Sequence, residues 1–306
     1  MENRVFAKPP EVIRIEPSSA CNLNCIHCPT GQNYGSDRGI MHRDVFDKIL
    51  KELSNKKVRV IVLYHGGEPF LNKDIFHMVK ELKSWGYPFI KTVTNGMKIE
   101  EWMFEKIVIS KLDSIEFSLD GSSIEENDSI RVGSDANKVF NNIDRLVYWK
   151  KKLHSNTPRI VISNCQIPSE KNINEGEFPK SPEYIIRYVS KYSEGDIFIK
   201  LCYALIWPGW KYNTDIYSSM SIYCRKKSYC EQLWEVMTIR YNGDVVPCCY
   251  DIMGKCVMGN ITKLGIDDIW NGPAFLAFRL AVSKKEYLPM CSDCNKIGNT
   301  TFLVRR

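Results

Sequence analysis

Two kinds of apolar pattern alternate along roughly the first two-thirds of the chain. Short runs rich in β-branched residues, such as residues 57–64, predict buried strands. Between these runs, apolar residues recur three and four positions apart, as in residues 43–53, and predict amphipathic helices. The predicted strands are residues 12–16, 57–64, 89–94, 114–119, 159–164 and 197–203. The predicted helices are residues 43–53, 73–84, 100–109, 136–153 and 182–192. About six strand–helix units in succession favour an α/β fold with a parallel sheet and helices on its outer face.

The alternation stops near residue 207, and the chain beyond it is rich in cysteine. Eight of the twelve cysteines lie between residues 202 and 294. Residues 236–241 and 244–248 predict a hairpin, because Asn242-Gly243 between them fits a type I′ turn. Residues 266–282 predict a helix. We therefore expect two domains, residues 1–206 and residues 207–306, the second being small, cysteine-rich and α+β.

The composition narrows the class of protein. The chain has 306 residues, of which 44% are hydrophobic, and this is enough for a sizeable core. No apolar stretch is long enough to span a bilayer, and the N-terminus lacks the apolar core of a signal peptide. A cytoplasmic protein without a membrane partner is expected. In that reducing compartment, twelve cysteines favour metal binding over disulfides. The net charge of +6 comes from scattered basic residues, which indicates a solvated surface rather than nucleic-acid binding.

Three cysteines lie close together directly after the first predicted strand. Cys21, Cys25 and Cys28 have the spacing C-x3-C-x2-C. Cysteine thiolates are the usual ligands of a 4Fe–4S cluster, and three of them leave one of its irons open to a small molecule. A structural zinc site is normally closed by four ligands. The spacing therefore predicts an open, reactive metal site at the carboxyl end of this strand, where parallel barrels carry their catalytic loops.

Three further motifs follow in a fixed order. They are the runs His65-Gly66-Gly67-Glu68-Pro69, Thr92-Val93-Thr94-Asn95-Gly96 and Ile115-Glu116-Phe117-Ser118-Leu119-Asp120-Gly121. Together with the three cysteines they resemble the radical AdoMet (S-adenosylmethionine) superfamily. The resemblance covers roughly two-thirds of the chain. It implies a partial (β/α)6 barrel with a 4Fe–4S cluster on Cys21, Cys25 and Cys28 and AdoMet on the open iron. It also implies reductive cleavage of AdoMet to a 5′-deoxyadenosyl radical that takes hydrogen from a substrate C–H bond.

The same resemblance implies residues that contact AdoMet. Gly66 and Gly67 lack side chains, so their backbone can approach a ligand closely. Glu68 is expected to accept a hydrogen bond from the amino group. Ser118 and Arg131 match positions that contact the ribose or the carboxylate, and a guanidinium suits a carboxylate.

Two polar residues near these motifs have a structural and a functional interpretation. His27 either stacks on the adenine or fills the loop, and Asn95 either shapes the pocket or serves the turn after its strand. Glu116 and Asp120 lie near the expected pocket without an assigned role.

A second set of cysteines lies in the C-terminal part. Cys230, Cys248, Cys291 and Cys294, with Gly243 between the first two, resemble the shortened four-cysteine ("twitch") form of the SPASM auxiliary-cluster domain. The resemblance implies one second 4Fe–4S cluster with every iron bound. A structural zinc site is the alternative, since four cysteines also suit zinc.

Two neighbouring cysteines leave this ligand set open, because Cys249 or Cys256 can replace one of its members. Cys249 is also a candidate donor of a hydrogen atom to a substrate radical, against the simpler interpretation of a small buried residue. Trp207, Trp210 and Tyr203 line the substrate pocket or pack in an aromatic core.

The leading functional hypothesis is a radical AdoMet oxidoreductase or epimerase acting on a sugar or aminocyclitol. Its partners would be a small-molecule or peptide substrate and a reducing protein such as flavodoxin or ferredoxin. Radical epimerisation or modification of a peptide is the second hypothesis. A non-enzymatic module that binds zinc or an iron–sulfur cluster is the third.

Overall fold

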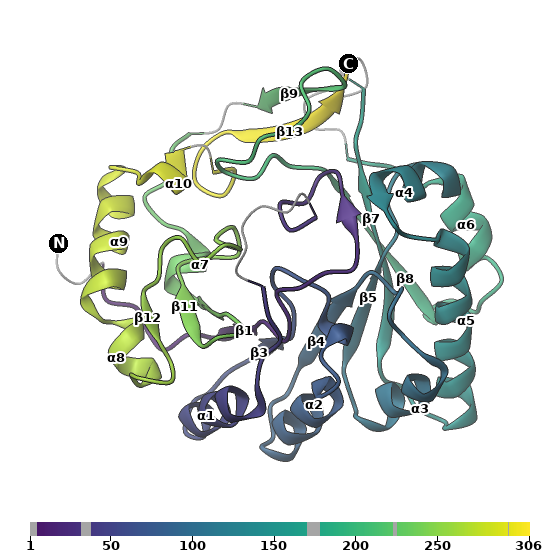
Figure 1. Ribbon diagram of the computed structural model, residues 1–306, viewed down its shortest axis with the longest axis horizontal. Coiled ribbons are helices and arrows are strands. Elements are labelled where there is room, and N and C mark those ends of the chain that lie inside the picture. Colours follow the sequence, from purple (N-terminus) through teal and green to yellow (C-terminus); the bar gives the residue numbers. More distant parts are fainter. Residues whose placement is uncertain (1–4, 32–37, 170–177, 223–224, 293) are drawn as a thin grey trace.

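The computed structural model describes residues 5–31, 38–169, 178–222, 225–292 and 294–306. Its centre is a nine-stranded sheet of order β12-β11-β10-β1-β3-β4-β5-β7-β8 (Figure 1). The strands of this sheet are β1 (Val12–Ile15), β3 (Val60–Val62), β4 (Ile90–Thr94), β5 (Ser114–Ser118), β7 (Arg159–Gln166), β8 (Ile197–Tyr203), β10 (Val236–Ile239), β11 (Asp244–Val246) and β12 (Gly259–Asn260). Two further pairs of strands are β2 (Asn24–Cys25) with β6 (Arg131–Val132), and β9 (Tyr217–Ile222) with β13 (Thr300–Arg305).

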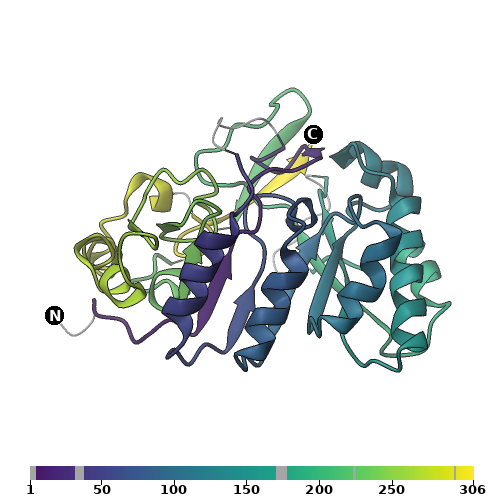
Figure 2. The same ribbon diagram turned by 60° about the horizontal axis from the view of Figure 1, so that its bottom comes forward.

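Helices cover the outer side of this sheet (Figure 2). The helical elements of the first half are α1 (Arg43–Leu53), the 3-10 turn η2 (Pro69–Leu71), α2 (Ile75–Ser84), α3 (Glu101–Ile109), α4 (Ile124–Ile130), α5 (Ala136–Lys152) and α6 (Glu183–Val189). Those of the second half are α7 (Glu231–Trp234), α8 (Ile266–Trp270), α9 (Pro273–Lys284) and α10 (Pro289–Ser292). None of the helices in the described ranges has the length and apolarity needed to cross a bilayer.

The predicted parallel α/β arrangement of the first half is confirmed. The strands β1, β3, β4, β5, β7 and β8 are all parallel to their neighbours. Alternate side chains of β5 show why the sheet has two different faces: Ile115 and Phe117 are fully buried in the core beneath the helices. Glu116 and Ser118 point to the opposite, inner face, where the functional residues gather.

The helix prediction for residues 43–53 matches α1, but two others need correction. The segment after Asn72 begins as a helix only at Ile75, since η2 precedes it and the Asn72 side chain accepts the Asp74 amide at 2.9 Å. The helix expected over residues 266–282 is two helices. A Cβ atom on Gly272 would lie 2.3 Å from the carbonyl oxygen of Asp268, and Pro273 has no amide hydrogen, so the helix restarts there.

The C-terminal part is joined to the first half through the sheet itself. Strand β10 pairs in parallel with β1, with Val12 opposite Val236 and Ile15 opposite Ile239. The antiparallel strands β11 and β12 extend the same sheet. The cysteine-rich part of the chain therefore continues the edge of the barrel sheet.

The predicted hairpin exists, but its predicted turn type is wrong. A type I′ turn needs positive φ at both central residues. Asn242 is not among the described non-glycine residues that have positive φ. The Arg240 amide donates to the Asp244 carbonyl at 2.8 Å, and the Gly243 amide donates to the Arg240 carbonyl at 2.9 Å. With φ of +86° at Gly243, this is a three-residue loop with a glycine bulge.

The pair β9–β13 was not predicted from the sequence. Strand β9 has the sequence Tyr-Ser-Ser-Met-Ser-Ile, which is too polar to stand out as a strand. Its partner β13 lies near the C-terminus, and the two cross the open end of the sheet (Figure 1).

Candidate functional site

The loop of Cys21, Cys25 and Cys28 lies at the carboxyl end of β1. Strand β2 pairs Cys25 with Arg131 of β6, and the Ile26 amide donates to the Ile130 carbonyl at 2.9 Å. The loop is therefore anchored on a segment more than a hundred positions away in the sequence, a contact that the cysteine spacing does not reveal.

The three thiols of this loop lie within electrostatic range of one another. Burial raises the pKa of Cys25 to about 12, and the neighbouring thiols Cys28 and Cys21 add to the shift. Burial likewise raises the pKa of Cys21. The side-chain amide of Asn95 lies 3.8 Å from Cys21 Sγ, and Arg131 Nη1 lies 3.6 Å from Cys25 Sγ. Both donors favour a negatively charged sulfur, so the donor set suits a metal cluster whose binding displaces the thiol protons.

Arg131 and His27 share one buried carboxylate beside this loop. Arg131 Nε lies 2.8 Å and His27 Nε2 lies 3.5 Å from Asp120 Oδ2. Burial opposes the charged guanidinium, but Asp120 and the nearby thiols outweigh it and raise the pKa of Arg131. Burial lowers the pKa of His27 and favours the neutral ring. Arg131 thus already has a carboxylate partner within the chain and contacts the cysteine loop directly.

The Gly66-Gly67 turn packs tightly against the protein itself. A Cβ atom on Gly67 would lie 2.3 Å from the Ala20 carbonyl oxygen, and one on Gly66 would lie 2.6 Å from the Ile252 side chain. The sequence prediction explained both glycines by close approach to a ligand. The structure gives a second reason, which is close approach to the backbone before the cysteine loop and to the C-terminal part.

Three protein donors occupy the carboxylate of Glu68. Its Oε1 accepts the Thr94 hydroxyl at 2.8 Å and the Phe70 amide at 3.1 Å, and its Oε2 accepts the Asn95 amide at 2.8 Å. Burial raises the pKa of Glu68 in spite of these bonds. A carboxylate offers about four acceptor positions, so one remains for a further donor.

Ser118 lies on the inner face of the sheet together with a chain of charged residues. Glu116, on the same face of β5, lies 2.7 Å from Lys91 Nζ and 2.8 Å from Lys200 Nζ. Burial opposes the charged carboxylate, but the two lysines outweigh it and lower the pKa of Glu116. Glu116 therefore faces the interior of the barrel as an ionised group with two cationic partners.

The second set of cysteines comes together from three separate segments. Cys230 precedes α7, Cys248 follows β11, and Cys291 and Cys294 lie in and after α10. All four line one small pocket. Burial raises the pKa of Cys291 to about 12 and that of Cys294 to about 11. Within the described ranges, no three His, Cys, Asp or Glu side chains are grouped so as to hold a single metal ion.

Cys249 and Cys256 both lie near the auxiliary thiols but differ in their surroundings. Cys249 is within electrostatic range of Cys230, Cys248 and Cys294. Cys256 is within electrostatic range of Cys291 and also lines a larger neighbouring cavity.

This cavity has a volume of about 400 Å³ and largely apolar walls. It is lined by Pro29, next to the cysteine loop, and by Trp207, Trp210, Ile252, Tyr250 and Met290. The last two residues also line the pocket of the auxiliary thiols. Trp207 and Trp210 line this cavity, and Trp210 also packs in an apolar cluster with Leu303. Tyr203 packs on Phe302 with ring centroids 5.9 Å apart.

Family models match both parts of the chain. Residues 15–147 match the radical SAM superfamily, and residues 230–295 match the iron–sulfur cluster-binding domain SPASM. The chain thus carries a radical SAM domain followed by a C-terminal SPASM domain. A radical SAM domain uses a 4Fe–4S cluster with AdoMet, and a SPASM domain binds auxiliary iron–sulfur clusters.

Curated relatives match the chain over different lengths. The "tungsten-containing aldehyde ferredoxin oxidoreductase cofactor-modifying protein" of Pyrococcus furiosus is 23% identical over 92% of this chain and 86% of its own length. A "probable GTP 3′,8-cyclase" of Methanococcus maripaludis is 28% identical, and the chain spans about half, 48%, of that relative.

Solved structures show the same fold. BtrN in complex with AdoMet and 2-DOIA has a TM-score of 0.59 and 16% identity, covering 95% of this chain and 94% of BtrN. Streptococcus suis SuiB bound to the precursor peptide SuiA has a TM-score of 0.59 and 15% identity, covering 90% of this chain and 68% of SuiB.

Proposed function

We propose that Cys21, Cys25 and Cys28 hold the AdoMet-binding 4Fe–4S cluster of this radical SAM enzyme. One observation carries this assignment: three mutually interacting thiols on one loop, two of which receive a nitrogen donor from Asn95 or Arg131. When bound, the reduced cluster supplies the electron that cleaves AdoMet to a 5′-deoxyadenosyl radical, which takes hydrogen from a substrate C–H bond.

The residues around this loop form the AdoMet site in this proposal. The turn of Gly66, Gly67 and Glu68 binds the amino group of AdoMet, which donates to the remaining acceptor position of the Glu68 carboxylate. Ser118 and Arg131 face the ribose and carboxylate. His27 and Asn95 complete the site beside the cysteine loop. Their common surroundings support this assignment, because Arg131, His27 and Asn95 each contact the loop or share Asp120.

Cys230, Cys248, Cys291 and Cys294 hold one auxiliary 4Fe–4S cluster in this proposal. The buried Cys230, Cys291 and Cys294 and the half-buried Cys248 line a single pocket, which suits a cluster with a thiolate on every iron. Such a cluster carries electrons, and a reducing protein such as flavodoxin or ferredoxin supplies them.

Two substrate classes remain for the reaction. Oxidation or epimerisation of a sugar or aminocyclitol is supported by the likeness in fold to BtrN, solved with 2-DOIA. Modification of a peptide is favoured by the apolar, tryptophan-lined cavity and by the likeness in fold to SuiB, solved with a precursor peptide. An apolar wall leaves the hydroxyl groups of a sugar without partners, at a cost of about 1–3 kcal/mol for each one left unsatisfied.

The decisive experiment is anaerobic reconstitution followed by turnover. We expect about eight irons per chain, and release of 5′-deoxyadenosine when reduced protein meets AdoMet. A protein that takes up zinc alone, and leaves AdoMet intact, would instead be the interaction module. Deuterium passing from a labelled sugar or peptide into 5′-deoxyadenosine then identifies the substrate class.

Cys249 stays the candidate hydrogen-atom donor. Cys249→Ala is expected to abolish incorporation of solvent deuterium into the product while AdoMet cleavage continues. Cys256→Ala is the matched control, because both thiols lie near the auxiliary cysteines but, of the two, only Cys256 lines the larger cavity. If only Cys256→Ala removes the deuterium, the donor is Cys256 and the assignment to Cys249 is wrong.

A further inference from the structure

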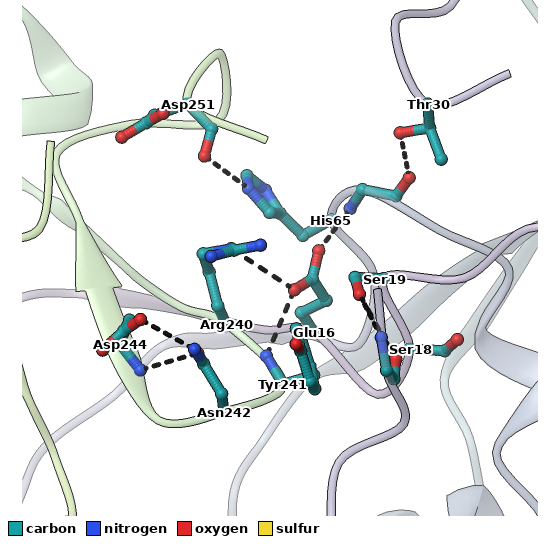
Figure 3. Close-up of polar contacts among 12 residues, drawn as sticks. Glu16, Ser18, Ser19, Thr30, His65, Arg240, Tyr241, Asn242, Asp244 and Asp251 are labelled. Atoms are coloured by element: carbon teal, nitrogen blue, oxygen red, sulfur yellow. Dashed lines mark hydrogen bonds and ion pairs between the residues drawn. The ribbon is translucent and has the colours of Figure 1, made fainter. Parts of the chain in front are cut away.

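A buried carboxylate lies between the Gly66-Gly67 turn and the C-terminal hairpin. Glu16 directly follows β1, and its side chain is 0% exposed. Figure 3 shows its carboxylate directed toward Arg240 and Tyr241. One oxygen, Oε1, accepts the Gly66 amide at 2.9 Å. The other, Oε2, accepts the Tyr241 amide at 3.1 Å. One rigid group therefore holds two backbone amides that are 175 positions apart (241 − 66).

Neighbouring contacts leave this carboxylate little freedom to move. Its own backbone amide donates to the Ile239 carbonyl at 2.9 Å, in line with the pairing of β1 and β10. Arg240 Nε lies 3.8 Å from Oε2, and the Arg240 side chain is 2% exposed. A Cβ atom on Gly254 would lie 2.2 Å from Arg240 Nη1, so the guanidinium is packed under the segment that follows Cys248. A backbone hydrogen bond, an ion pair and tight packing around Arg240 thus fix the Glu16 carboxylate against the C-terminal part of the chain.

The Gly66 peptide is also held from its other side. The Thr30 hydroxyl, two residues beyond Cys28, donates to the Gly66 carbonyl oxygen (Figure 3). The adjacent His65 lies with Nε2 3.4 Å from the Asp251 carbonyl oxygen. Burial lowers the pKa of His65 to about 3, so the ring is neutral, and Nε2 carries the hydrogen because a carbonyl can only accept. The Asp251 carboxylate in turn accepts the Lys255 and Cys256 amides, each at 2.8 Å. The Gly66-Gly67 turn is therefore hydrogen-bonded to the segment after the cysteine loop, and the adjacent His65 is hydrogen-bonded to the segment after the C-terminal hairpin.

We infer that Glu16 is a positioning residue that couples the AdoMet-binding turn to the auxiliary-cluster hairpin. This inference rests on the proposed function, in which the turn binds AdoMet and Cys248, two residues after β11, binds the auxiliary cluster. A shift of the Gly66 amide moves a carboxylate whose other oxygen holds Tyr241. AdoMet binding and hairpin order are therefore linked, and such linkage acts equally in both directions.

Glu16→Gln tests the coupling with little change in side-chain volume. A glutamine has one accepting oxygen, so one of the two amides then faces an NH2 group and loses its partner. We expect the Kd for AdoMet to rise about tenfold, which corresponds to about 1.4 kcal/mol. We also expect the EPR signal of the reduced auxiliary cluster to shift, a change that simple loss of stability would not produce.

Asp144→Asn is the matched control. Asp144 also accepts from two donors, the Tyr188 and Tyr192 hydroxyls, but it lies on the outer helix α5. This variant should leave AdoMet affinity and the EPR signal unchanged, while lowering stability.

Hydrogen exchange of the wild-type holoenzyme gives a second test that needs no variant. By reciprocity, saturating AdoMet should slow exchange at the Tyr241 amide about tenfold, with no such change at the outer end of α5. If wild-type protein binds no AdoMet, the proposed function itself fails. If AdoMet binds but Tyr241 exchange is unaltered, or if Glu16→Gln binds AdoMet as tightly as wild type, the coupling by Glu16 is wrong and the proposed function stands.

Discussion

The two cysteine sites of this protein are built in opposite ways. Cys21, Cys25 and Cys28 lie on one loop of eight residues, and side chains from other strands reach in to contact their sulfur atoms. Cys230, Cys248, Cys291 and Cys294 come from segments spread over 65 residues, and they line a pocket closed by apolar side chains. The cysteines of the first site are close together in sequence, and only the side chains that contact their sulfur atoms come from distant segments. The cysteines of the second site come together only when the C-terminal part of the chain folds. The three-cysteine loop suits a cluster with one iron open to a ligand, and the closed four-cysteine pocket suits a cluster that carries electrons.

The largest expected effect separates the chemistry of these two sites. Cys25→Ala should reduce 5′-deoxyadenosine formation to background, because the AdoMet-binding cluster loses a ligand. Cys291→Ala should retain AdoMet cleavage but lose product formation. Each variant should contain about half the iron of wild type. Iron analysis and chromatography of 5′-deoxyadenosine measure both quantities, and abolished AdoMet cleavage in Cys291→Ala would contradict the division of roles.

A large stability effect is expected at the contacts behind the first site. Arg131→Met removes the guanidinium partner of Asp120, a carboxylate that is 1% exposed, and should lower the free energy of unfolding by about 3–5 kcal/mol. Urea unfolding of the wild type and the variant measures this loss of free energy. Arg187→Met is the control, since the Arg187–Glu183 pair on α6 is largely exposed and should contribute less than about 1 kcal/mol. Equal losses in the two variants would show that Asp120 does not depend on Arg131.

A moderate effect is expected in the hairpin that leads to the second site. Gly243 has φ of +86°, and a Cβ atom there would lie 3.1 Å from Thr262 Cγ2. Gly243→Ala should therefore cost about 1–2 kcal/mol of unfolding free energy. Gly195→Ala, with φ of +90° and no atom within 4 Å of the new Cβ, separates backbone strain from crowding. Since only Gly243 belongs to the hairpin, only its variant should weaken iron retention in the auxiliary cluster.

The smallest effect concerns pH and the inner face of the barrel. Burial opposes the ionised form of Glu116, but Lys200 and Lys91 outweigh it and hold its pKa below the usual range of a glutamate. This contribution to stability is complete above the unfolded pKa and is lost as the pH falls through the lower folded pKa. Lys200→Met should weaken this acid-dependent loss, which urea unfolding at a series of pH values measures. A pH dependence identical to that of wild type would show that Lys200 does not stabilise the ionised form.

Sequence reasoning succeeded where a short segment carries its own physical signal. The helical spacing of residues 43–53 matches α1 residue for residue, and the spacing of strands and helices identified the parallel sheet. It failed where a contact from elsewhere decided the local conformation. The Asn242-Gly243 pair forms a hairpin, but its loop has three residues and presents the Tyr241 amide to Glu16. The pair of strands β9 and β13 was missed because β9 has a polar sequence and is defined as a strand by its antiparallel pairing with β13.

The α/β class, the cysteine loop and the order of the motifs around it could be inferred from the amino-acid sequence, because they depend on residues a few positions apart. Which distant groups share one site depends on how the strands and loops pack together. Glu16, Thr30 and Asp251 carry no motif, yet they connect the Gly66 turn and its neighbour His65 to the cysteine loop and to the C-terminal hairpin. A buried carboxylate needs partners, and pairing of β10 with β1 brings the Tyr241 amide within reach of Glu16 across 225 positions of chain.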